Sequence, residues 1–249
     1  MIEIPILYED ESLLVICKPA GVVINRAESV KEETAQDWME EKIKNEKLKI
    51  KKLGQNYLST EEQEFLNRTG IVHRLDKETS GVMVLSKTVQ AFHFLKMQFK
   101  ERKTEKKYRA LVHGSVAPLN GTINLPLKRN VLNRRRFAVN VEGKMARTEY
   151  QVETRFKDQK GNEYSLLDIG LKTGRTHQIR VHFSHLGYPL VSDPIYLGKR
   201  LSEDTTWCPR LFLHSYFLAF THPETEKRVE YSATLPKDLT QALDYLSEV

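Results

Sequence analysis

Cysteine is scarce in this chain: Cys17 and Cys208 are the only two among 249 residues. They do not form a CxxC pair, which argues against a zinc site or a redox-active dithiol, so we expect two reduced thiols with structural roles. Long apolar runs are also lacking, and no basic start with an apolar core and cleavage site opens the chain. The sequence therefore predicts a cytoplasmic protein that does not enter a membrane.

Internal repeats, low-complexity tracts and linkers are lacking as well. We therefore expect a single domain over residues 1–249, long enough to bury a substantial core. Residues 30–66 are rich in Lys and Glu, with scattered apolar residues such as Trp38, Met39 and Ile43, which predicts a charged helical appendage on the surface of that domain. The chain carries 39 Lys and Arg against 33 Asp and Glu, a formal charge of +6 that suits an anionic partner without requiring one.

Apolar periodicity predicts more strands than helices. Because the predicted strands mostly follow one another directly, we expect an α+β fold with a mixed, largely antiparallel central sheet flanked by helices and loops. Residues 114–140 read as a loop with a basic cluster. The expected strands are two within 4–18, then 81–88, 107–114, 146–156, 163–172, 210–220 and 228–236; the expected helices are 89–103, 175–187 and one from Lys237 onward.

A dense group of charged and hydroxyl side chains, "HRLDKETSG" at 73–81, interrupts two apolar runs that read as strands. An ordinary surface turn needs only Gly, Asn, Asp or Pro, so this composition indicates a loop with a chemical task. Asp76 and Glu78 would lie on one face about 6.6 Å apart if the chain were extended, within reach of a glycosidase-like pair, whereas a turn would destroy that geometry. Asp76 alone is also compatible with an Asx-turn or a helix cap.

A second polar segment, "KTGRTHQIRVH", places Arg180 beside the apolar stripe of a predicted helix. An arginine there can hold a carboxylate in its ionised form, as a nucleophile or base requires. Tyr108, near the start of a predicted strand, fits half-buried packing or a stacking surface for a base. His182 and His185 are better explained as structural histidines than as metal ligands, because no third ligand accompanies them.

Five separated blocks together resemble the RluA family of RNA pseudouridine synthases, in matching order and spacing over nearly the whole chain. Departures from the family pattern are small, such as Ser215 in place of the usual Ala and an extra Leu197, and none falls on a family catalytic position. Many relatives carry a small accessory RNA-binding domain ahead of the first block, and from this sequence we expect a catalytic domain without a separate N-terminal RNA-binding domain. The blocks are "KPAG" at 18–21, "HRLDKETSG" at 73–81, "KYRALVHG" at 107–114, "TGRTHQIRVH" at 173–182 and "RLFLHSYFLAFTHP" at 210–223.

The resemblance implies the pseudouridine synthase fold, with a catalytic cleft, and isomerisation of specific uridines in structured RNA, either ribosomal or transfer RNA. By similarity, Asp76 is the essential catalytic residue, Arg180 pairs with it, Tyr108 stacks on the uracil and Leu213 walls the pocket. Because isomerisation adds and removes nothing, we expect no cofactor and no metal. We also expect a monomer.

The resemblance further implies a set of substrate-binding residues. A paired base has to be flipped out of its helix before it can react, and we expect Arg74 to fill the vacated stack. The basic stretch around 128–136 is expected to contact phosphates, although a solvated charged loop would look similar. The remaining expected substrate-binding residues are Lys18, Thr79, His177, Arg134, Arg135 and Arg136.

Two other function classes compete with this interpretation. A non-catalytic RNA-binding or ribosome-assembly protein on the same fold would not need Asp76, Tyr108 and Arg180 together. A nucleoside or glycoside hydrolase would use Asp76 with Glu78, and its activity would depend on both carboxylates.

Overall fold

The structure, a computed structural model, describes residues 2–28, 30–52 and 58–249. It divides into two compact units, each assembled from two separate stretches of the chain. The expectation of a single domain stays a prediction. Within the described ranges, no helix combines the length and the apolar character needed to cross a membrane. The first unit comprises Met1–Thr104 and Phe217–Ala233, and the second comprises Glu105–Tyr216 and Thr234–Val249.

Antiparallel strands form the sheet of the first unit. Strands β1 (Ile6–Glu9) and β2 (Leu13–Lys18) are joined by a tight turn, and β2 pairs along its whole length with β3 (Ser80–Ser86). All seven residues of β3 are buried, as expected for a β-branched and apolar run inside a sheet. Strand β10 (Arg228–Ser232) pairs with the part of β9 (Leu213–Thr221) that belongs to this unit.

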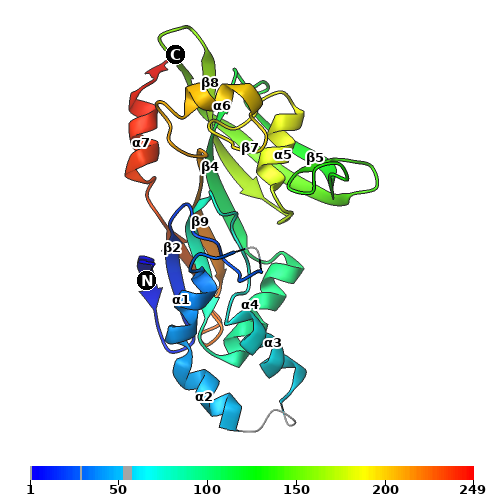
Figure 1. Cartoon of the computed structure of the whole chain (residues 1–249), viewed down its shortest axis with the longest axis vertical. Coiled ribbons are helices and arrows are strands. Elements are labelled where there is room, and N and C mark those ends of the chain that lie inside the picture. The colour runs from blue at the N-terminus through cyan, green and yellow to red at the C-terminus, as the bar shows by residue number, and fades with distance from the viewer. Residues whose placement is uncertain (1, 29, 53–57) are drawn as a thin grey trace. The chain divides into compact units, whose positions relative to one another are not determined.

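Among the described residues of this unit, four α-helices accompany the sheet, and Figure 1 shows α3 and α4 side by side. They pack through Phe65 and Phe92, whose ring centroids lie 5.8 Å apart in an edge-to-face arrangement. Helices α1, α2 and α3 fall on the stretch 30–66 predicted to be a charged helical appendage, of which residues 53–57 lie outside the described part of the chain, and the appendage stays a prediction. Met39 and Ile43 are buried, so this stretch also contributes to the core. The helices are α1 (Ala35–Lys42), α2 (Lys44–Lys52), α3 (Thr60–Arg68) and α4 (Val89–Glu101).

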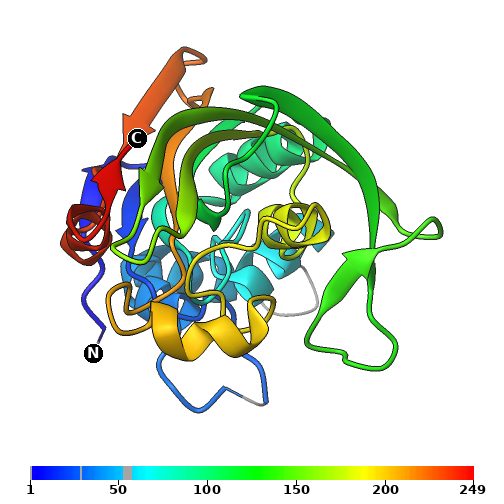
Figure 2. The same ribbon diagram turned by 90° about the horizontal axis from the view of Figure 1, so that it is seen from above.

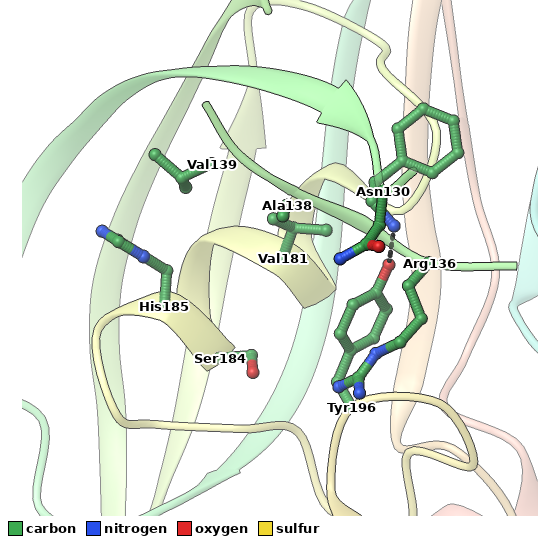
Figure 3. Close-up of a pocket in the computed structure, with 9 residues that line it drawn as sticks. Asn130, Arg136, Ala138, Val139, Val181, Ser184, His185 and Tyr196 are labelled. Atoms are coloured by element: carbon green, nitrogen blue, oxygen red, sulfur yellow. Dashed lines mark hydrogen bonds between the residues drawn. The ribbon is translucent and has the colours of Figure 1, made fainter. Parts of the chain in front are cut away.

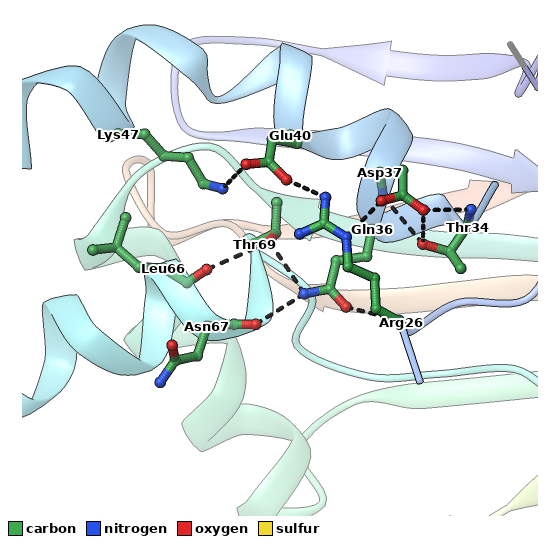
Figure 4. A network of polar contacts seen from close by, with 9 residues as sticks. All are labelled: Arg26, Thr34, Gln36, Asp37, Glu40, Lys47, Leu66, Asn67 and Thr69. Carbon is green, nitrogen blue, oxygen red and sulfur yellow. Dashed lines mark hydrogen bonds and ion pairs between the residues drawn. The ribbon is translucent and has the colours of Figure 1, made fainter. Parts of the chain in front are cut away.

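A polar network ties the start of α1 to the end of α3 (Figure 4). Thr34 and Asp37 form a capping box, in which each side chain binds the backbone amide of the other residue. Asp37 also accepts from Arg26 at 2.5 Å. Gln36 donates to the carbonyl of Asn67 at 2.9 Å. These contacts fix the stretch of chain that leads into the loop at 72–79.

The second unit is a curved antiparallel sheet in the order β4-β8-β7-β5-β6, with β11 (Ser247–Glu248) added to β7. Figure 2 shows the strands β5 and β7 curving around helix α5. The strands are β4 (Glu105–His113), β5 (Asn120–Arg129), β6 (Phe137–Val139), β7 (Lys144–Lys157) and β8 (Glu163–Leu171); the helices are α5 (Gln178–His185), the short 3-10 helix η2 (Gly198–Arg200), α6 (Leu201–Asp204) and α7 (Lys237–Asp244).

The expected α+β class with a largely antiparallel sheet is confirmed, and so are most expected elements. Three local expectations were wrong. Strands β5 and β6 occupy much of the stretch 114–140 that read as a loop. The apolar run before the charged loop is not a strand, because Ile71 makes a single isolated bridge to Leu85 after helix α3. The helix predicted over 175–187 is shorter, since α5 covers Gln178–His185, and Leu186 after it is 43% exposed.

Candidate active site

The loop that carries Asp76 runs through residues 72–79, between helix α3 and strand β3. Leu75 and Thr79 are buried, whereas Asp76 is half-buried and Arg74 is exposed. Buried residues on either side of the carboxylate fix the backbone, because each would lose apolar or hydrogen-bonded surroundings if the loop moved. The loop is therefore anchored while its carboxylate and guanidinium groups remain accessible.

The backbone turns directly after Asp76. The amide of Thr79 donates to the carbonyl of Asp76 at 3.1 Å, which is the closing bond of a four-residue β-turn. Asp76 and Glu78 therefore do not share one face of an extended chain. The hydrolase interpretation loses the geometry on which it depended.

Lys18 holds this turn in place from the end of strand β2. Its side chain is fully buried, and Nζ donates to the carbonyls of Pro19 at 2.7 Å and of Val22 and Lys77 at 3.0 Å. The carbonyl of Lys77 also accepts from the amide of Gly21 at 2.8 Å. A buried ammonium group needs such acceptors, because leaving it without them in a low-dielectric interior is very unfavourable. These bonds give Lys18 a positioning role; its substrate contact stays a prediction.

His73 anchors the other end of the loop, a role that the sequence did not reveal. Its Nε2 accepts from the amide of Val84 in strand β3 at 3.1 Å. Its ring stacks on Phe99 of helix α4, with centroids 4.3 Å apart and planes inclined by 17°. Since Nε2 accepts, the neutral ring carries its proton on Nδ1.

The polar segment before helix α5 is organised by Gln178, which is buried. Its Oε1 accepts from the hydroxyl of Thr173 at 2.7 Å and from the amide of Arg175 at 3.0 Å. His177 adopts a left-handed φ of 55°, an uncommon conformation for a residue with a side chain, and its Nδ1 lies 2.9 Å from the hydroxyl of Tyr196. Strain of this kind is found where the surroundings determine the backbone, as at functional sites.

Arg180 lies in α5 with 2% of its surface exposed, and it binds the carboxylate of Asp193 through two parallel bonds. Nε donates to Oδ2 at 2.8 Å and Nη2 donates to Oδ1 at 2.6 Å. The same Oδ1 accepts from the amides of Ile195 and Tyr196 at 2.8 and 3.0 Å. The sequence predicted a carboxylate partner for Arg180 but missed Asp193, whose place before a proline is a turn signal rather than a catalytic one. The pairing of Arg180 with Asp76 stays a prediction.

Tyr196 links helix α5 to the basic segment of the chain, and the sequence did not single it out. The guanidinium carbons of Arg136 and Arg180 lie 5.1 and 5.3 Å from the centre of its ring, within the range of cation–π attraction. Its hydroxyl accepts from the amide of Phe137 at 2.9 Å. Burial raises the pKa of Tyr196, which keeps this hydroxyl neutral.

The basic loop, residues 130–136 between β5 and β6, has an ordered backbone. Oδ1 of Asn130 accepts from the amides of Leu132 and Asn133, both at 2.9 Å. Arg134 and Arg135 are exposed, whereas Arg136 is half-buried against Tyr196. Bonds within the loop thus constrain its backbone, and its exposed cations are of the kind that neutralises phosphates.

Tyr108 and Leu213 are both mostly buried, at 7% and 4% exposure. Tyr108 lies in β4 opposite Ile169 of β8, and Leu213 is the first residue of β9. Burial of this degree suits the wall of a narrow pocket and suits ordinary core packing equally well. Their roles stay predictions.

Of the two histidines in α5, His182 is buried and His185 is exposed. His182 is buried, with Nε2 3.2 Å from the carbonyl of Leu125 and Nδ1 2.9 Å from the hydroxyl of Thr148. Since a carbonyl only accepts, Nε2 donates and Nδ1 accepts. Burial lowers the pKa of His182, so it is a neutral structural side chain.

The candidate residues fall into two groups, one in each unit. The structure brings together several of them within each group, around the loop at 72–79 in one unit and around α5 in the other. Lys18, Arg74, Asp76 and Thr79 belong to the first unit; Tyr108, Arg134, Arg135, Arg136, His177, Arg180 and Leu213 belong to the second.

Sequence comparison identifies relatives over the whole chain. Residues 12–185 match the family model described as RNA pseudouridylate synthase. Ribosomal large subunit pseudouridine synthase D of Pseudomonas aeruginosa is 37% identical over 258 residues, covering 99% of this chain and 73% of that protein. An uncharacterized RNA pseudouridine synthase of Aquifex aeolicus is also 37% identical, covering 99% of this chain and 74% of that protein.

Solved structures agree with the sequence relatives. Human RNA pseudouridylate synthase domain containing 1 superposes with a TM-score of 0.72 at 25% identity, covering 99% of this chain and 89% of that one. Human RNA pseudouridylate synthase domain containing 4 has the same fold, with a TM-score of 0.68 at 23% identity, covering 98% of this chain and 94% of that one. The predicted fold and family are confirmed, and the chain belongs to the RluA-type RNA pseudouridine synthases, which are isomerases.

Proposed function

We propose that this chain isomerises specific uridines of ribosomal RNA to pseudouridine in the cytoplasm, with Asp76 as the catalytic residue. The observation that carries the choice of RNA is the 37% identity, over 99% of the chain, to a ribosomal large subunit pseudouridine synthase. Transfer RNA is the alternative substrate, since the sequence blocks do not distinguish the two.

The reaction breaks the bond between N1 of uracil and C1′ of ribose, turns the base and joins C5 to C1′; C5 then loses its proton and N1 gains one, so that the atoms of substrate and product are the same. The carboxylate of Asp76 has three possible ways to start it: attack on C1′, attack on C6, or removal of a ribose proton. The anchored loop supports each of them, because a fixed carboxylate avoids the reorganisation that a mobile one would need. Arg180 is proposed to keep this carboxylate ionised.

Tyr108 is proposed to stack on the uracil and to accept or relay the C5 proton, with Leu213 as a wall of the same pocket. Arg74 is exposed and lies two residues before Asp76, so it is the proposed filler of the stack from which the uridine is flipped. The basic loop supplies phosphate contacts. Because the product has the same atoms as the substrate, the proposed mechanism uses neither cofactor nor metal, and we propose that a monomer carries it out.

The test of catalysis compares Asp76→Asn with Glu78→Gln, a matched neutral substitution in the same turn. Asp76→Asn should abolish pseudouridine formation while leaving RNA affinity within about threefold of wild type, because the loop carboxylate performs chemistry and the basic surface binds. Glu78→Gln should retain most of its activity. Turnover by purified Asp76→Asn would refute the assignment, and equal inactivity of both variants would revive a mechanism with two carboxylates.

The test of the substrate is a comparison of pseudouridine positions in ribosomal and transfer RNA from a strain with and without the gene. Loss of specific ribosomal pseudouridines, restored by the wild-type gene and not by Asp76→Asn, is the expected result. Loss confined to transfer RNA would overturn the choice of ribosomal RNA and leave the isomerase intact.

A further inference from the structure

A pocket of about 250 Å³ lies between the basic loop, strand β6 and helix α5 (Figure 3). Its apolar wall is formed by Ala138 and Val139 of β6 and by Val181 of α5. Val181 is buried in a small cluster against which Val139 and Tyr196 pack, so this wall is firmly supported. The pocket belongs to the second unit and contains none of the residues proposed to hold the target uridine.

The rim of the pocket carries polar groups that bind no protein partner. In the described part of the chain, no hydrogen bond involves the amide nitrogen of Asn130, the hydroxyl of Ser184 or the ring of His185. Asn130 uses only its oxygen, which accepts from two backbone amides of the basic loop. An amide nitrogen donates, whereas a hydroxyl and a neutral imidazole both donate and accept.

Arg136 gives the pocket a positive edge. Its guanidinium lies over the ring of Tyr196, 5.1 Å from the centre, and Figure 3 shows the two side chains together at one side of the pocket. The exposed Arg134 and Arg135 belong to the same loop. A polyanion bound to this loop would therefore run past the mouth of the pocket.

We infer that this pocket receives one unstacked base of the RNA, next in sequence to the target uridine or close to it. A volume of about 250 Å³ is slightly below the range of pockets for drug-sized ligands and suits a single ring system with its ribose outside. An apolar wall with donors and acceptors on the rim matches the face and the edge of a nucleobase, and proteins read single-stranded RNA by this combination. The inference rests on the proposed function for the presence of RNA and adds a site of sequence selection.

Filling the pocket tests this assignment. Val139→Trp places a large ring inside it, whereas Val141→Trp places the same ring on a residue that is 93% exposed in the turn after β6 and does not line the pocket. Each variant is assayed for kcat/KM on short RNAs in which one nucleotide near the target uridine at a time is abasic. With wild type and Val141→Trp, one abasic position should reduce kcat/KM about tenfold, as expected for the loss of one bound base.

The kcat/KM of Val139→Trp should already be about tenfold lower on intact RNA. Removing the base at that abasic position should lower it by less than about twofold more, because the tryptophan already keeps the base out of the pocket. Equal abasic losses in Val139→Trp and wild type would overturn the inference, and so would a wild type that is insensitive at every flanking position.

A second pair of variants needs no bulky residue. Asn130→Asp keeps an oxygen for the two backbone amides and replaces the donor on the rim with an anionic acceptor, while Asn133→Asp makes the same charge change three residues along the loop. The preference of Asn130→Asp for the identity of the flanking base should change, whereas Asn133→Asp should bind more weakly without a change in preference. Identical preferences in the two variants would contradict a base in the pocket.

Affinity measured by fluorescence anisotropy on the same abasic RNAs separates this inference from the proposed function. The double-mutant cycle combines Val139→Trp in the protein with the abasic position in the RNA. If wild type forms no pseudouridine but the two changes still weaken binding non-additively, the proposed function fails and the pocket assignment stands. If pseudouridine forms and the binding cycle is additive, the pocket assignment alone is overturned.

Discussion

At the scale of single residues, the ion pair of Arg180 and Asp193 is deeply buried, with side chains 2% and 0% exposed. Asp193→Asn would leave a buried guanidinium facing a neutral amide. Breaking a buried pair in this way typically costs about 3–5 kcal/mol, so we expect a large fall in the free energy of unfolding, measured with urea, together with a loss of pseudouridine formation. We therefore expect the pair to contribute to the stability of the second unit and to hold Arg180 in place.

The matched control for this substitution is Asp238→Asn. Asp238 binds Arg210 through two bonds of 2.5 and 3.0 Å, but its side chain is 38% exposed. Water screens such a pair, and its loss should cost about 1 kcal/mol or less. Similar losses of unfolding free energy in Asp193→Asn and Asp238→Asn would show that burial does not make the first ion pair stronger than the second.

Substitutions of Tyr108 can separate the role of its aromatic ring from the role of its hydroxyl. Tyr108→Phe keeps the aromatic face and removes the group proposed to handle the C5 proton, so it should still break the glycosidic bond but stall before product release. Tyr108→Leu should be inactive at the first step. Single-turnover kinetics with trapping of the enzyme-bound base measures both. Pseudouridine formation by Tyr108→Phe near the wild-type rate would reduce Tyr108 to a stacking surface.

The sequence revealed Asp76 because chemically active residues are concentrated within one short loop. It did not reveal Asp193 or Tyr196, although they determine the surroundings of Arg180. Asp193 reads as the start of a turn before proline, and Tyr196 reads as one more aromatic residue. Their importance comes from contacts with residues 13 to 59 positions away, as in the bonds of Asp193 to Arg180 and of Phe137 to Tyr196, which local patterns do not encode.

At the scale of elements, the basic loop should account for part of the salt dependence of RNA binding. Changing Arg134, Arg135 and Arg136 together to Gln should weaken binding and flatten the slope of log affinity against log salt by about 2, since each lost phosphate contact removes about 0.7 for single-stranded RNA. The control changes three exposed cations elsewhere in the second unit, Lys199, Arg200 and Lys237.

A triple variant of the basic loop with the wild-type slope would mean that the loop is a solvated charged surface. A control variant with the same reduced slope would mean that RNA contacts are spread over the whole unit.

The turn between β1 and β2 is held by Asp10, which should make the first unit sensitive to acid. Burial alone would raise the pKa of Asp10, but hydrogen bonds from the amides of Leu13 and Ser12 and from His222 outweigh it and lower the pKa to about 2. A carboxyl group whose pKa is lower in the folded state stabilises the fold above its unfolded pKa, near 4, and this contribution is lost as the pH falls toward 2.

The free energy of unfolding should therefore decrease more steeply between about pH 4 and pH 2 in wild type than in Asp10→Asn, which keeps an oxygen acceptor but no titration. Denaturation with urea at a series of pH values measures the difference. Parallel profiles for the two proteins would show that Asp10 does not contribute through its charge.

Strands and helices with strong periodicity were predicted well, as β2, β3, α4 and β8 show. Strand β5 was missed because its sequence, "NGTINLPLKR", contains Gly121 and Pro126, two residues that normally interrupt strands. Its pairing with β7 on one side and β6 on the other overrides those local preferences. The missed strands matter for function, because they carry the basic loop at their junction.

At the scale of the whole molecule, the second unit depends on helix α7, which returns to it after the chain has passed through the first unit. Leu239 of α7 is fully buried in a core with Leu111, Phe212 and Val191. Leu239→Ala should lower the free energy of unfolding by about 2–5 kcal/mol, the range for a buried leucine that leaves a cavity. Leu132→Ala, at a residue 95% exposed, should change it by less than about 0.5 kcal/mol. Equal effects would place α7 outside the cooperative core.

The division of the chain into two interleaved units has a consequence for recombination within the gene. Residues 1–104 lack β10 and the part of β9 that completes their sheet, and residues 105–216 lack α7 and its share of the core. A single genetic breakpoint between Thr104 and Glu105 would therefore separate each unit from a piece of itself. A single crossover at that point cannot transfer either unit intact, so we expect functional exchange to carry the loop that bears Asp76 and the helix that bears Arg180 together.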